Sequence, residues 1–279
     1  MRIATWNVNS LRARTNRVLA WLDQHRPEVV CLQETKCGDD HVPAAAFAEL
    51  GYETAHHGLH HWNGVAILSR VGLTDVRPGF RGRNRPPFDE ARLLTARCGE
   101  LEVTSLYVPN GRELDDPHYL YKLRWLERLR GDLLAAGVAE RPWVVAGDFN
   151  VAPADLDIYA PERWRKRTHA SPPERDAIAA LLDLGLTDVH RALDPSAGTY
   201  TFWSYLPQSV PRNMGLRIDL LLTSPPVTVR ARRVWVDTDE RAGARASDHA
   251  PVVLELDPLA DAAGGMDEGT LPTSAELTS

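Results

Sequence analysis

Short apolar runs recur from one end of the chain to the other and predict the strands of one core. Each is no longer than a typical buried strand, and no Gly/Ser-rich linker divides them into separate groups. The runs cover residues 3–8, 29–32, 65–68, 103–108, 144–146, 218–222 and 252–256. We therefore expect one domain over residues 1–257.

Helical periodicity or helix-end signals mark three segments between these runs. Residues 16–25 and 119–134 repeat apolar positions at helical spacing. A third helix is predicted over 173–184, because Pro173-Glu174-Arg175 suits a first helical turn and Gly185 follows the segment. Strands in close succession with few helices between them predict an α/β fold. We expect two mixed β-sheets packed face to face with helices on the outer faces, a four-layer α/β sandwich.

Composition limits the class of protein. No apolar stretch reaches the roughly 20 residues needed to cross a bilayer, and the chain starts in a strand pattern without a signal-peptide core. We therefore expect a cytoplasmic protein with no membrane partner. Cys31, Cys37 and Cys98 form no C-x-x-C pair, so reduced thiols are predicted rather than disulfides or a cysteine metal site.

Net charge gives a weak argument against a nucleic-acid partner, because the formal value is -6. Its distribution weakens that argument further. Residues 258–279 carry four acidic and no basic side chains, and setting these four charges aside leaves -2 on the rest of the chain. This segment is rich in Ala, Gly, Thr and Ser and is predicted to be a disordered acidic tail.

Polar residues that interrupt or follow the apolar runs are the most informative feature of the sequence. One such residue is readily explained as a turn that ends a strand, but several together suggest functional groups on a rigid scaffold. Asp219, flanked by Ile218 and Leu220, is expensive to bury without a histidine or metal partner. The set is Asn7, Glu34, Asp148, Asn150, Asp219, Asp248 and His249.

These residue types suit the hydrolysis of a phosphodiester. Oxygen ligands such as Glu34 and Asn7 are those that Mg²⁺ or Mn²⁺ prefers. A neutral Asn150 can hydrogen-bond developing negative charge without repelling phosphate. His249 beside a carboxylate is either an oriented base or an imidazolium that neutralises phosphate. The pattern predicts a phosphodiesterase that depends on a divalent metal.

Six motifs also carry a family resemblance. They are Trp6-Asn7-Val8-Asn9-Ser10-Leu11-Arg12-Ala13, Leu32-Gln33-Glu34-Thr35-Lys36, Tyr107-Val108-Pro109-Asn110-Gly111, Gly147-Asp148-Phe149-Asn150-Val151-Ala152-Pro153, Gly215-Leu216-Arg217-Ile218-Asp219 and Ser247-Asp248-His249-Ala250-Pro251. In this order, over nearly the whole chain except the tail, the sequence resembles the exonuclease III family of abasic-site endonucleases. That family lies within the endonuclease/exonuclease/phosphatase superfamily, so the resemblance implies that residues 1–257 form its catalytic domain.

The resemblance implies a metal site. Glu34 would be the principal ligand, with Asn7 beside it and Asp248 close by. The implied ion is Mg²⁺, with Mn²⁺ as the alternative.

The resemblance also implies roles in catalysis. Asp219 would orient His249, and Asp148 would exchange the proton of either the nucleophile or the leaving group. Asn150 and Tyr107 would contact the scissile phosphate. For Tyr107, the sequence without the resemblance favours a core aromatic before a proline turn.

Substrate-binding residues follow from the same resemblance. Trp203 and Leu216 match positions that wall the pocket for a flipped sugar without a base, whereas the residues alone leave Trp203 equally a core aromatic. Such a pocket selects abasic sugar, because a nucleotide without a paired base costs least to extrude. Asn110, which follows Tyr107 in its motif, resembles the residue found in the DNA-repair branch of the superfamily. Arg212 with Met214 could form a wedge into the duplex.

Other features of the sequence leave two interpretations open or qualify the resemblance. The basic clusters 12–14, 81–85 and 163–167 either grip backbone phosphates or are solvated surface. His56, His57, His60 and His61 lack the spacing of a metal site and are interpreted as histidines of a surface loop. Residues 169–175 keep the Pro-Glu-Arg of the family but lose the bulky residue expected before it. That departure concerns which kinds of DNA damage the protein prefers as substrate, and not the hydrolytic reaction.

The main hypothesis is a DNA-repair enzyme that cuts the backbone 5′ to abasic sites, leaving a 3′-hydroxyl and a 5′-deoxyribose phosphate. It would also repair 3′ ends and act as a 3′-to-5′ exonuclease. Its partner would be double-stranded DNA with abasic sites or blocked 3′ ends, and it would act as a monomer. One alternative is a relative that hydrolyses RNA or phosphoinositides. The other, a catalytically silent module that binds DNA damage, is disfavoured because every residue of catalytic type is present.

Overall fold

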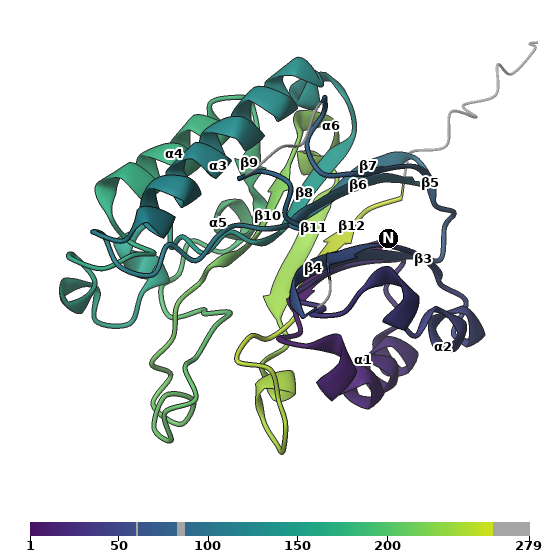
Figure 1. The fold of residues 1–279 in the computed structure, drawn as a ribbon, viewed down its shortest axis with the longest axis horizontal. Coiled ribbons are helices and arrows are strands. Elements are labelled where there is room, and N and C mark those ends of the chain that lie inside the picture. The colour runs from purple at the N-terminus through teal and green to yellow at the C-terminus, as the bar shows by residue number, and fades with distance from the viewer. Residues whose placement is uncertain (60, 83–86, 259–279) are drawn as a thin grey trace, which may run out of the picture.

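Two six-stranded β-sheets face each other at the centre of the molecule, in a computed structural model that describes residues 1–59, 61–82 and 87–258 (Figure 1). The first sheet has the order β11 (Ala231–Val236), β12 (Val252–Leu256), β1 (Arg2–Asn7), β2 (Val29–Gln33), β4 (Trp62–Ser69), β3 (Glu53–Leu59). The second has the order β5 (Thr74–Pro78), β6 (Leu93–Cys98), β7 (Leu101–Tyr107), β8 (Trp143–Asp148), β10 (Asp219–Thr223), β9 (Thr187–Asp188).

Both sheets are mixed, as expected. β1 and β2 pair in parallel, with α1 (Leu11–His25) as the connection, and β7 and β8 pair in parallel, with α3 (Pro117–Ala135) between them. A parallel pair needs such a crossover, whereas the remaining, antiparallel strand pairs do not. The carboxyl ends of β1, β2, β7 and β8 are where the sequence places Asn7, Glu34, Tyr107 and Asp148.

Successive side chains of a strand point to opposite faces of its sheet, so each sheet contributes to the core between the sheets and to a second core under its helices. The inner faces bury one cluster that includes Ile3, Val29, Val103 and Val144. On the outer face of the second sheet, α3 and α4 (Pro172–Leu182) pack against the strands through buried side chains such as Leu129 of α3. On the outer face of the first sheet, α1 and α2 (Ala44–Glu49) do the same (Figure 1). The expected four-layer α/β sandwich is confirmed.

The predicted helices are all present, with starts set by capping side chains. α1 begins before the predicted residue 16, because the Ser10 side chain accepts from Ala13 N. Asp116 caps α3 ahead of Pro117, and Ser171 with Glu174 forms a capping box on α4. The remaining helical segments are α5 (Val189–Leu193), α6 (Pro225–Thr228), η1 (Asp39–His41), η2 (Val138–Glu140), η3 (Asp155–Asp157), η4 (Pro161–Arg163) and η5 (Thr238–Arg241).

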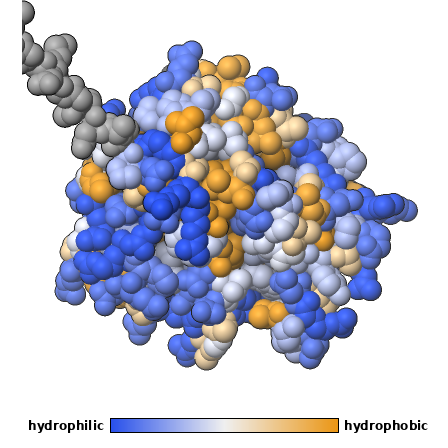
Figure 2. All heavy atoms as spheres, turned by 180° about the vertical axis from the view of Figure 1, so that it is seen from behind, coloured by the Kyte–Doolittle hydropathy of each residue, from blue (hydrophilic) through white to orange (hydrophobic). Residues whose placement is uncertain are grey.

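The surface opposite to the view of Figure 1 has an apolar band surrounded by hydrophilic side chains (Figure 2). Apolar surface of this kind is common and by itself assigns no partner. None of the helices in the described ranges has the length and apolar character of a membrane span. The predicted tail lies outside the described residues, except for Pro258.

Candidate active site

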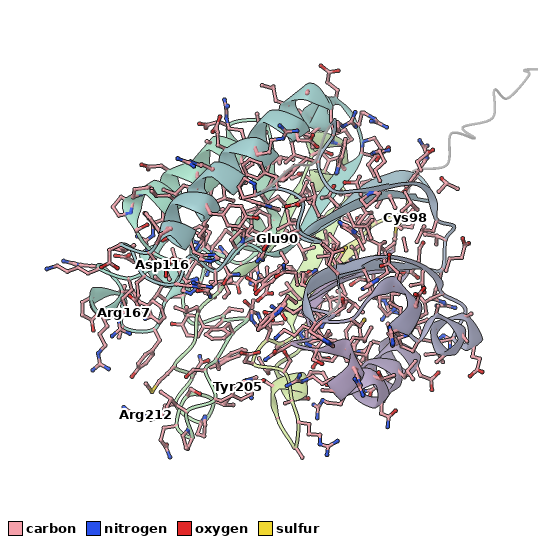
Figure 3. All side chains as sticks on the ribbon, viewed as in Figure 1. Glu90, Cys98, Asp116, Arg167, Tyr205 and Arg212 are labelled. Atoms are coloured by element: carbon pink, nitrogen blue, oxygen red, sulfur yellow. The ribbon has the colours of Figure 1, made fainter. Side chains whose placement is uncertain are left out.

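Strand ends and loops gather at one end of the sheets. Figure 3 shows Asp116, Arg167, Tyr205 and Arg212 on loops at this end, whereas Cys98 lies at the opposite end. Cα register places Asn7 opposite Gln33, Tyr107 opposite Asp148, and Asp148 opposite Asp219. The two sheets therefore bring together side chains that are distant in sequence.

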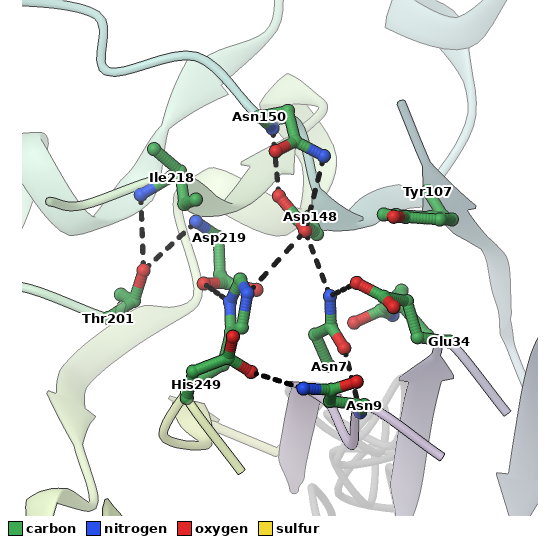
Figure 4. A network of polar contacts seen from close by, with 12 residues as sticks. Asn7, Asn9, Glu34, Tyr107, Asp148, Asn150, Thr201, Ile218, Asp219 and His249 are labelled. Carbon is green, nitrogen blue, oxygen red and sulfur yellow. Dashed lines mark hydrogen bonds and ion pairs between the residues drawn. The ribbon is translucent and has the colours of Figure 1, made fainter. Parts of the chain in front are cut away.

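The centre of the site is a group of two carboxylates and one imidazole. Among the described residues, Glu34, Asp148 and His249 each offer a possible ligand atom, and these atoms lie within 4.8 Å of one another. Asn7 joins the carboxylates, because its Nδ2 donates to Glu34 Oε1 at 2.8 Å and to Asp148 Oδ2 at 2.9 Å (Figure 4). Its Oδ1, the atom that would bind a metal, accepts from Asn9 N at 2.9 Å. In this arrangement Asn7 orients the carboxylates.

Asp219 and His249 form the pair that the sequence predicts. His249 Nδ1 lies 2.8 Å from Asp219 Oδ2, and the other ring nitrogen, Nε2, lies 3.8 Å from Asp148 Oδ2 (Figure 4). The Thr201 hydroxyl accepts from the main-chain N of Ile218 and Asp219 at 3.1 Å each, which fixes the start of β10. The imidazole is thus held between two buried carboxylates.

Amide groups border the carboxylates on the side of β7 and β8. Asn150 N donates to Asp148 Oδ1 at 2.8 Å, and Asn150 Nδ2 donates to Val108 O at 2.9 Å. Asn110 Nδ2 donates to Asn150 Oδ1 at 3.3 Å. The Tyr107 ring lies under the guanidinium of Arg92, whose Cζ is 4.7 Å from the ring centroid. Tyr107 also packs against the inner core, and its hydroxyl interacts with Glu34, which is consistent with the predicted place at the site.

Burial and charge shift the protonation of these groups. Burial lowers the pKa of His249, but Asp219 and Asp148 outweigh it and raise the value to about 10. Burial raises the pKa of Asp148, His249 opposes this effect, and the net value is about 7. Burial and the Glu34 carboxylate hold the pKa of Tyr107 well above its ordinary range. Without a bound cation the site thus favours a charged imidazole and a carboxyl able to take or give a proton near neutrality.

Sequence reasoning missed two polar residues at the edge of this cluster. Lys36 Nζ lies 2.7 Å from Glu34 Oε2 and donates to Asn9 Oδ1 at 2.6 Å. Asn9 Nδ2 in turn donates to Asp248 Oδ1 at 3.0 Å, so Asp248 is linked to Glu34 through two side chains and does not touch it. Burial raises the pKa of Glu34, but Lys36 and Asn7 outweigh it and the net shift is downward. Both missed residues stand within the six motifs, which was the available signal.

Two adjacent aromatic residues, Phe202 and Trp203, lie near the site and have different surroundings. Trp203 is 3% exposed, packs with Tyr200 and Ala250, and donates from Nε1 to Asn213 Oδ1 at 3.0 Å. Its neighbour Phe202 points to the catalytic group, with its ring centroid 5.0 Å from that of His249. Successive residues of an extended segment face opposite ways, so the two rings have different neighbours. The role of Trp203 in the pocket wall stays a prediction, and Phe202 is the aromatic that contacts His249.

The other predicted substrate-binding residues lie in two parts of the structure, one buried and one on an exposed loop. Leu216 is buried with Ile158, Ala170 and the partly buried Phe202 and Trp164, which is consistent with an apolar wall. Arg212 is exposed and Met214 half-buried on the loop before Gly215. Figure 3 shows Arg212 at the outer edge of the molecule on this loop.

His169 is a further residue at the site that sequence reasoning did not single out. Its Nδ1 lies 2.6 Å from Asn150 O, and its Nε2 lies 3.5 Å from Asn110 Nδ2. The ring also meets Trp164, with centroids 6.0 Å apart. Burial and the nearby Lys122 lower the pKa of His169 to about 4, so the ring is neutral at ordinary pH.

The histidine-rich segment differs from its interpretation as a surface loop. His56 lies in β3 with a side chain only 5% exposed, and its ring nitrogens contact Asp39 Oδ1 at 2.7 Å and Thr35 Oγ1 at 2.8 Å. The surface interpretation is therefore wrong for His56, while His60 lies outside the described residues. Alternation along β3 places His56 on the face opposite to the core residue Ala55, where Thr35 and Asp39 cover the ring.

The basic clusters are only partly described. Arg12 is exposed and lines a small pocket with Lys36. Arg14 donates to Asn9 O and to Tyr205 Oη and so stabilises the local structure. Residues 83–86 of the second cluster lie outside the described ranges. Contact with phosphates remains a prediction for all three clusters.

Comparisons with known proteins agree with this geometry. The model of the Endonuclease/Exonuclease/phosphatase family matches residues 4–249. The chain is 32% identical over 268 residues to "Exodeoxyribonuclease III" of Haemophilus influenzae, which covers 92% of this chain and 100% of that relative.

Solved structures give the same result. An AP endonuclease from Archaeoglobus fulgidus has a TM-score of 0.89 and 36% identity, covering 92% of this chain and 100% of that one. The 3′-5′ exonuclease NExo from Neisseria meningitidis has a TM-score of 0.88 and 40% identity, with coverage of 92% and 100%. The fold, the polar cluster and these matches lead to one conclusion: the chain belongs to the Endonuclease/Exonuclease/phosphatase family.

Proposed function

We propose that this protein is a DNA-repair nuclease that hydrolyses the backbone 5′ to abasic sites and also processes blocked 3′ ends. The observation that carries the proposal is the cluster of the partly buried Glu34 with the buried Asp148 and His249. Its members can neutralise and position a phosphodiester and exchange a proton with the reacting groups. The proposal includes a monomer that acts in the cytoplasm, as the sequence predicts.

The donor set of the site fits a divalent cation. Glu34 offers a carboxylate at the end of β2, and Asp148 offers a second one within the same 4.8 Å group. Carboxylate oxygens suit Mg²⁺, which we propose as the ion, with Mn²⁺ as a substitute. A cation held there by Glu34 would act as a Lewis acid toward the phosphate. Asp248, joined to Glu34 only through Asn9 and Lys36, would complete the surroundings of the ion indirectly.

The remaining groups act on the phosphate and on protons. A protonated His249, fixed by Asp219, places positive charge on the side of the cluster that faces Asp148. The amide of Asn150 and the hydroxyl of Tyr107 are hydrogen-bond donors that stabilise negative charge without bringing more of it. Asp148, with a pKa near neutrality, is the group able to take a proton from the nucleophile or to supply one to the leaving oxygen.

The choice of DNA as substrate is supported by the relatives. The similar proteins described above include an exodeoxyribonuclease and an AP endonuclease. The wall formed by Phe202 and Leu216 beside His249 is apolar, as a pocket for a sugar without its base requires.

Processing of 3′ ends is a second candidate activity with its own support. A Neisseria structure at 39% identity is described as a 3′ phosphatase bound to product DNA. Both activities break a phosphate ester beside a sugar, so the same cluster can serve both.

One experiment tests the proposal. The protein is incubated with Mg²⁺ and a duplex that carries a single abasic site, and separately with an intact duplex, a 3′-phosphate duplex, RNA and an inositol phosphate. We expect cleavage 5′ to the abasic site, removal of the 3′ phosphate, and no turnover in EDTA. Cleavage of RNA or inositol phosphate in preference to both DNA substrates would overturn the proposal. The Asp148→Asn variant is the control for contaminating nucleases.

A further inference from the structure

A buried lysine lies beside the catalytic cluster and is not used in the chemistry above. Lys122, on α3, is 0% exposed, and its Nζ lies 2.5 Å from Oε1 of Glu174, which is also 0% exposed on α4. A buried ion pair rarely adds stability over apolar side chains of similar size. The other partners of the two charges therefore indicate what the pair does.

The Lys122 ammonium joins two loops of the site through their main chains. Nζ donates to Asn150 O at 2.6 Å and to Asn110 O at 3.2 Å. Glu174 Oε1 is the third close acceptor of the ammonium, and Thr168 Oγ1 lies farther away, at 3.4 Å from Nζ. The side chains of Asn150 and Asn110 meet at 3.3 Å on the side toward the cluster. The lysine thus fixes, from behind, the two amides that border the carboxylates.

Glu174 holds the segment that follows. Oε1 accepts from Thr168 Oγ1 at 2.7 Å and from His169 N at 3.0 Å, while Oε2 accepts from Ser171 N at 3.0 Å. His169 then contacts the same Asn150 oxygen that Lys122 binds. The two charges and their partners form one network around the main chain of Asn150.

We propose that Lys122 is a positioning residue: with Glu174 as its counter-charge, it fixes Asn150 and Asn110 for contact with the phosphate of the substrate. The inference rests on the proposed phosphodiesterase function. A charged side chain is required because two carbonyl oxygens and a carboxylate converge on one point. An apolar side chain would remove the one donor that these oxygens share. His169 Nδ1 and Thr168 Oγ1 would still contact Asn150 O and Asn110 O, but the link that holds the two loops to α3 would be lost.

The test removes both charges together. Lys122→Met/Glu174→Gln leaves no unpaired buried charge. The amide introduced on α4 keeps one oxygen that can accept from Thr168 and His169, whereas its NH2 group cannot accept from Ser171 N and Oγ as Oε2 does. We expect kcat on the abasic duplex to fall about 10- to 100-fold, the effect of a small misplacement of a group at the site. Duplex affinity, measured without metal, should change little, because phosphates outside the reacting position supply most of it.

A double-mutant cycle separates positioning from general damage. If Lys122 acts through the Asn150 side chain, the same pair of changes made in an Asn150→Ala background should cause almost no further loss of kcat. Leu133→Ala, in the core of the same helix, is the matched control for lost stability and should lower Tm while leaving kcat unchanged.

The outcomes are distinct. An equal loss of kcat in both backgrounds, or unchanged kcat in a folded variant, would overturn the positioning role. If the paired variant does not fold, Lys122→Gln/Glu174→Gln tests the claim, because it also removes both charges and keeps a donor at position 122. A smaller loss of kcat is then expected, and it must also vanish in the Asn150→Ala background. Failure of the wild-type protein to cleave any DNA substrate would instead remove the proposed function.

Discussion

His249 Nδ1 lies 2.8 Å from Asp219 Oδ2, a contact made between residues 30 positions apart. When Nδ1 of a histidine is hydrogen-bonded to a carboxylate, the ring orientation is fixed and Nε2 points away from that carboxylate. In this site Nε2 points toward Asp148. Oδ1 of Asp219 has no hydrogen-bond partner among the described residues, so its charge acts largely on the imidazole. Asp219 therefore controls both the orientation and the charge of His249.

Replacing that carboxylate tests this control. Asp219→Asn should lower kcat about 100-fold or more, because an amide neither fixes the ring orientation nor stabilises the imidazolium. The measurement is single-turnover cleavage of the abasic duplex with saturating Mg²⁺. Normal chemistry in a folded variant would show that His249 needs no partner.

The metal dependence of the reaction should depend on Glu34. Glu34→Ala is expected to raise the Mg²⁺ concentration for half-maximal activity about tenfold or more, because a carboxylate of the proposed ligand set is lost. A metal titration of the cleavage rate gives this value. Asp23→Ala, which removes a carboxylate exposed on α1, is the control and should leave the titration unchanged. An unaltered requirement in Glu34→Ala would take this residue out of the ligand set.

Asp148→Asn should reduce turnover far more than DNA affinity. The amide keeps the shape of the carboxylate but cannot exchange a proton at neutral pH, so a loss of about 10²- to 10⁴-fold in kcat is expected. The two oxygens of Asp148 accept from Asn7 Nδ2 and from Asn150 N. An asparagine has one such oxygen and therefore keeps only one of these two hydrogen bonds. Fluorescence anisotropy gives affinity and single-turnover kinetics gives chemistry. Weak binding with near-normal chemistry would mean that Asp148 only positions the substrate.

Two neighbouring aromatics should behave differently. Phe202→Ala removes the ring that contacts His249 and should lower kcat/KM on abasic duplex while changing Tm little, because Phe202 is only partly buried. Trp203→Ala should cost about 3–5 kcal/mol of folding free energy, the usual effect of truncating a buried aromatic. Thermal melts and steady-state kinetics on both variants check this. A selective loss of catalysis in Trp203→Ala would show instead that Trp203 belongs to the pocket wall.

Stability at acidic pH should depend on His190. Burial and the nearby Arg217 lower the pKa of His190 to about 4, and its Nδ1 has no partner among the described residues. The folded state thus favours the neutral ring, so its contribution is complete above the ordinary pKa of 6.5 and is lost as pH falls toward 4. His190→Gln should lose about 3 kcal/mol less unfolding free energy than wild type over that range. Denaturant unfolding at several pH values measures the difference, and parallel pH curves would contradict it.

The sequence predicted the parts of the site that lie at the ends of strong apolar runs. Asn7, Glu34, Asp148 and Asp219 interrupt or follow strands whose pattern is local, so their backbone positions needed no tertiary information. The same holds for the main helices, where capping side chains and leucine spacing act within a few residues.

Other features required the fold. Lys122 occupies a helix in which a lysine ordinarily faces water, and only the packing of α3 against α4 buries it beside Glu174. Phe202 and Trp203 are adjacent, so no pattern within the chain could say which one reaches His249.

The sequence by itself determined which residues stand at strand ends and what chemistry their types allow. Only the tertiary structure decided which of them meet, because a contact such as His249 with Asp219 depends on strand register and loop paths. The direction of each pKa shift was decided in the same way, since it depends on burial and on charges from distant segments.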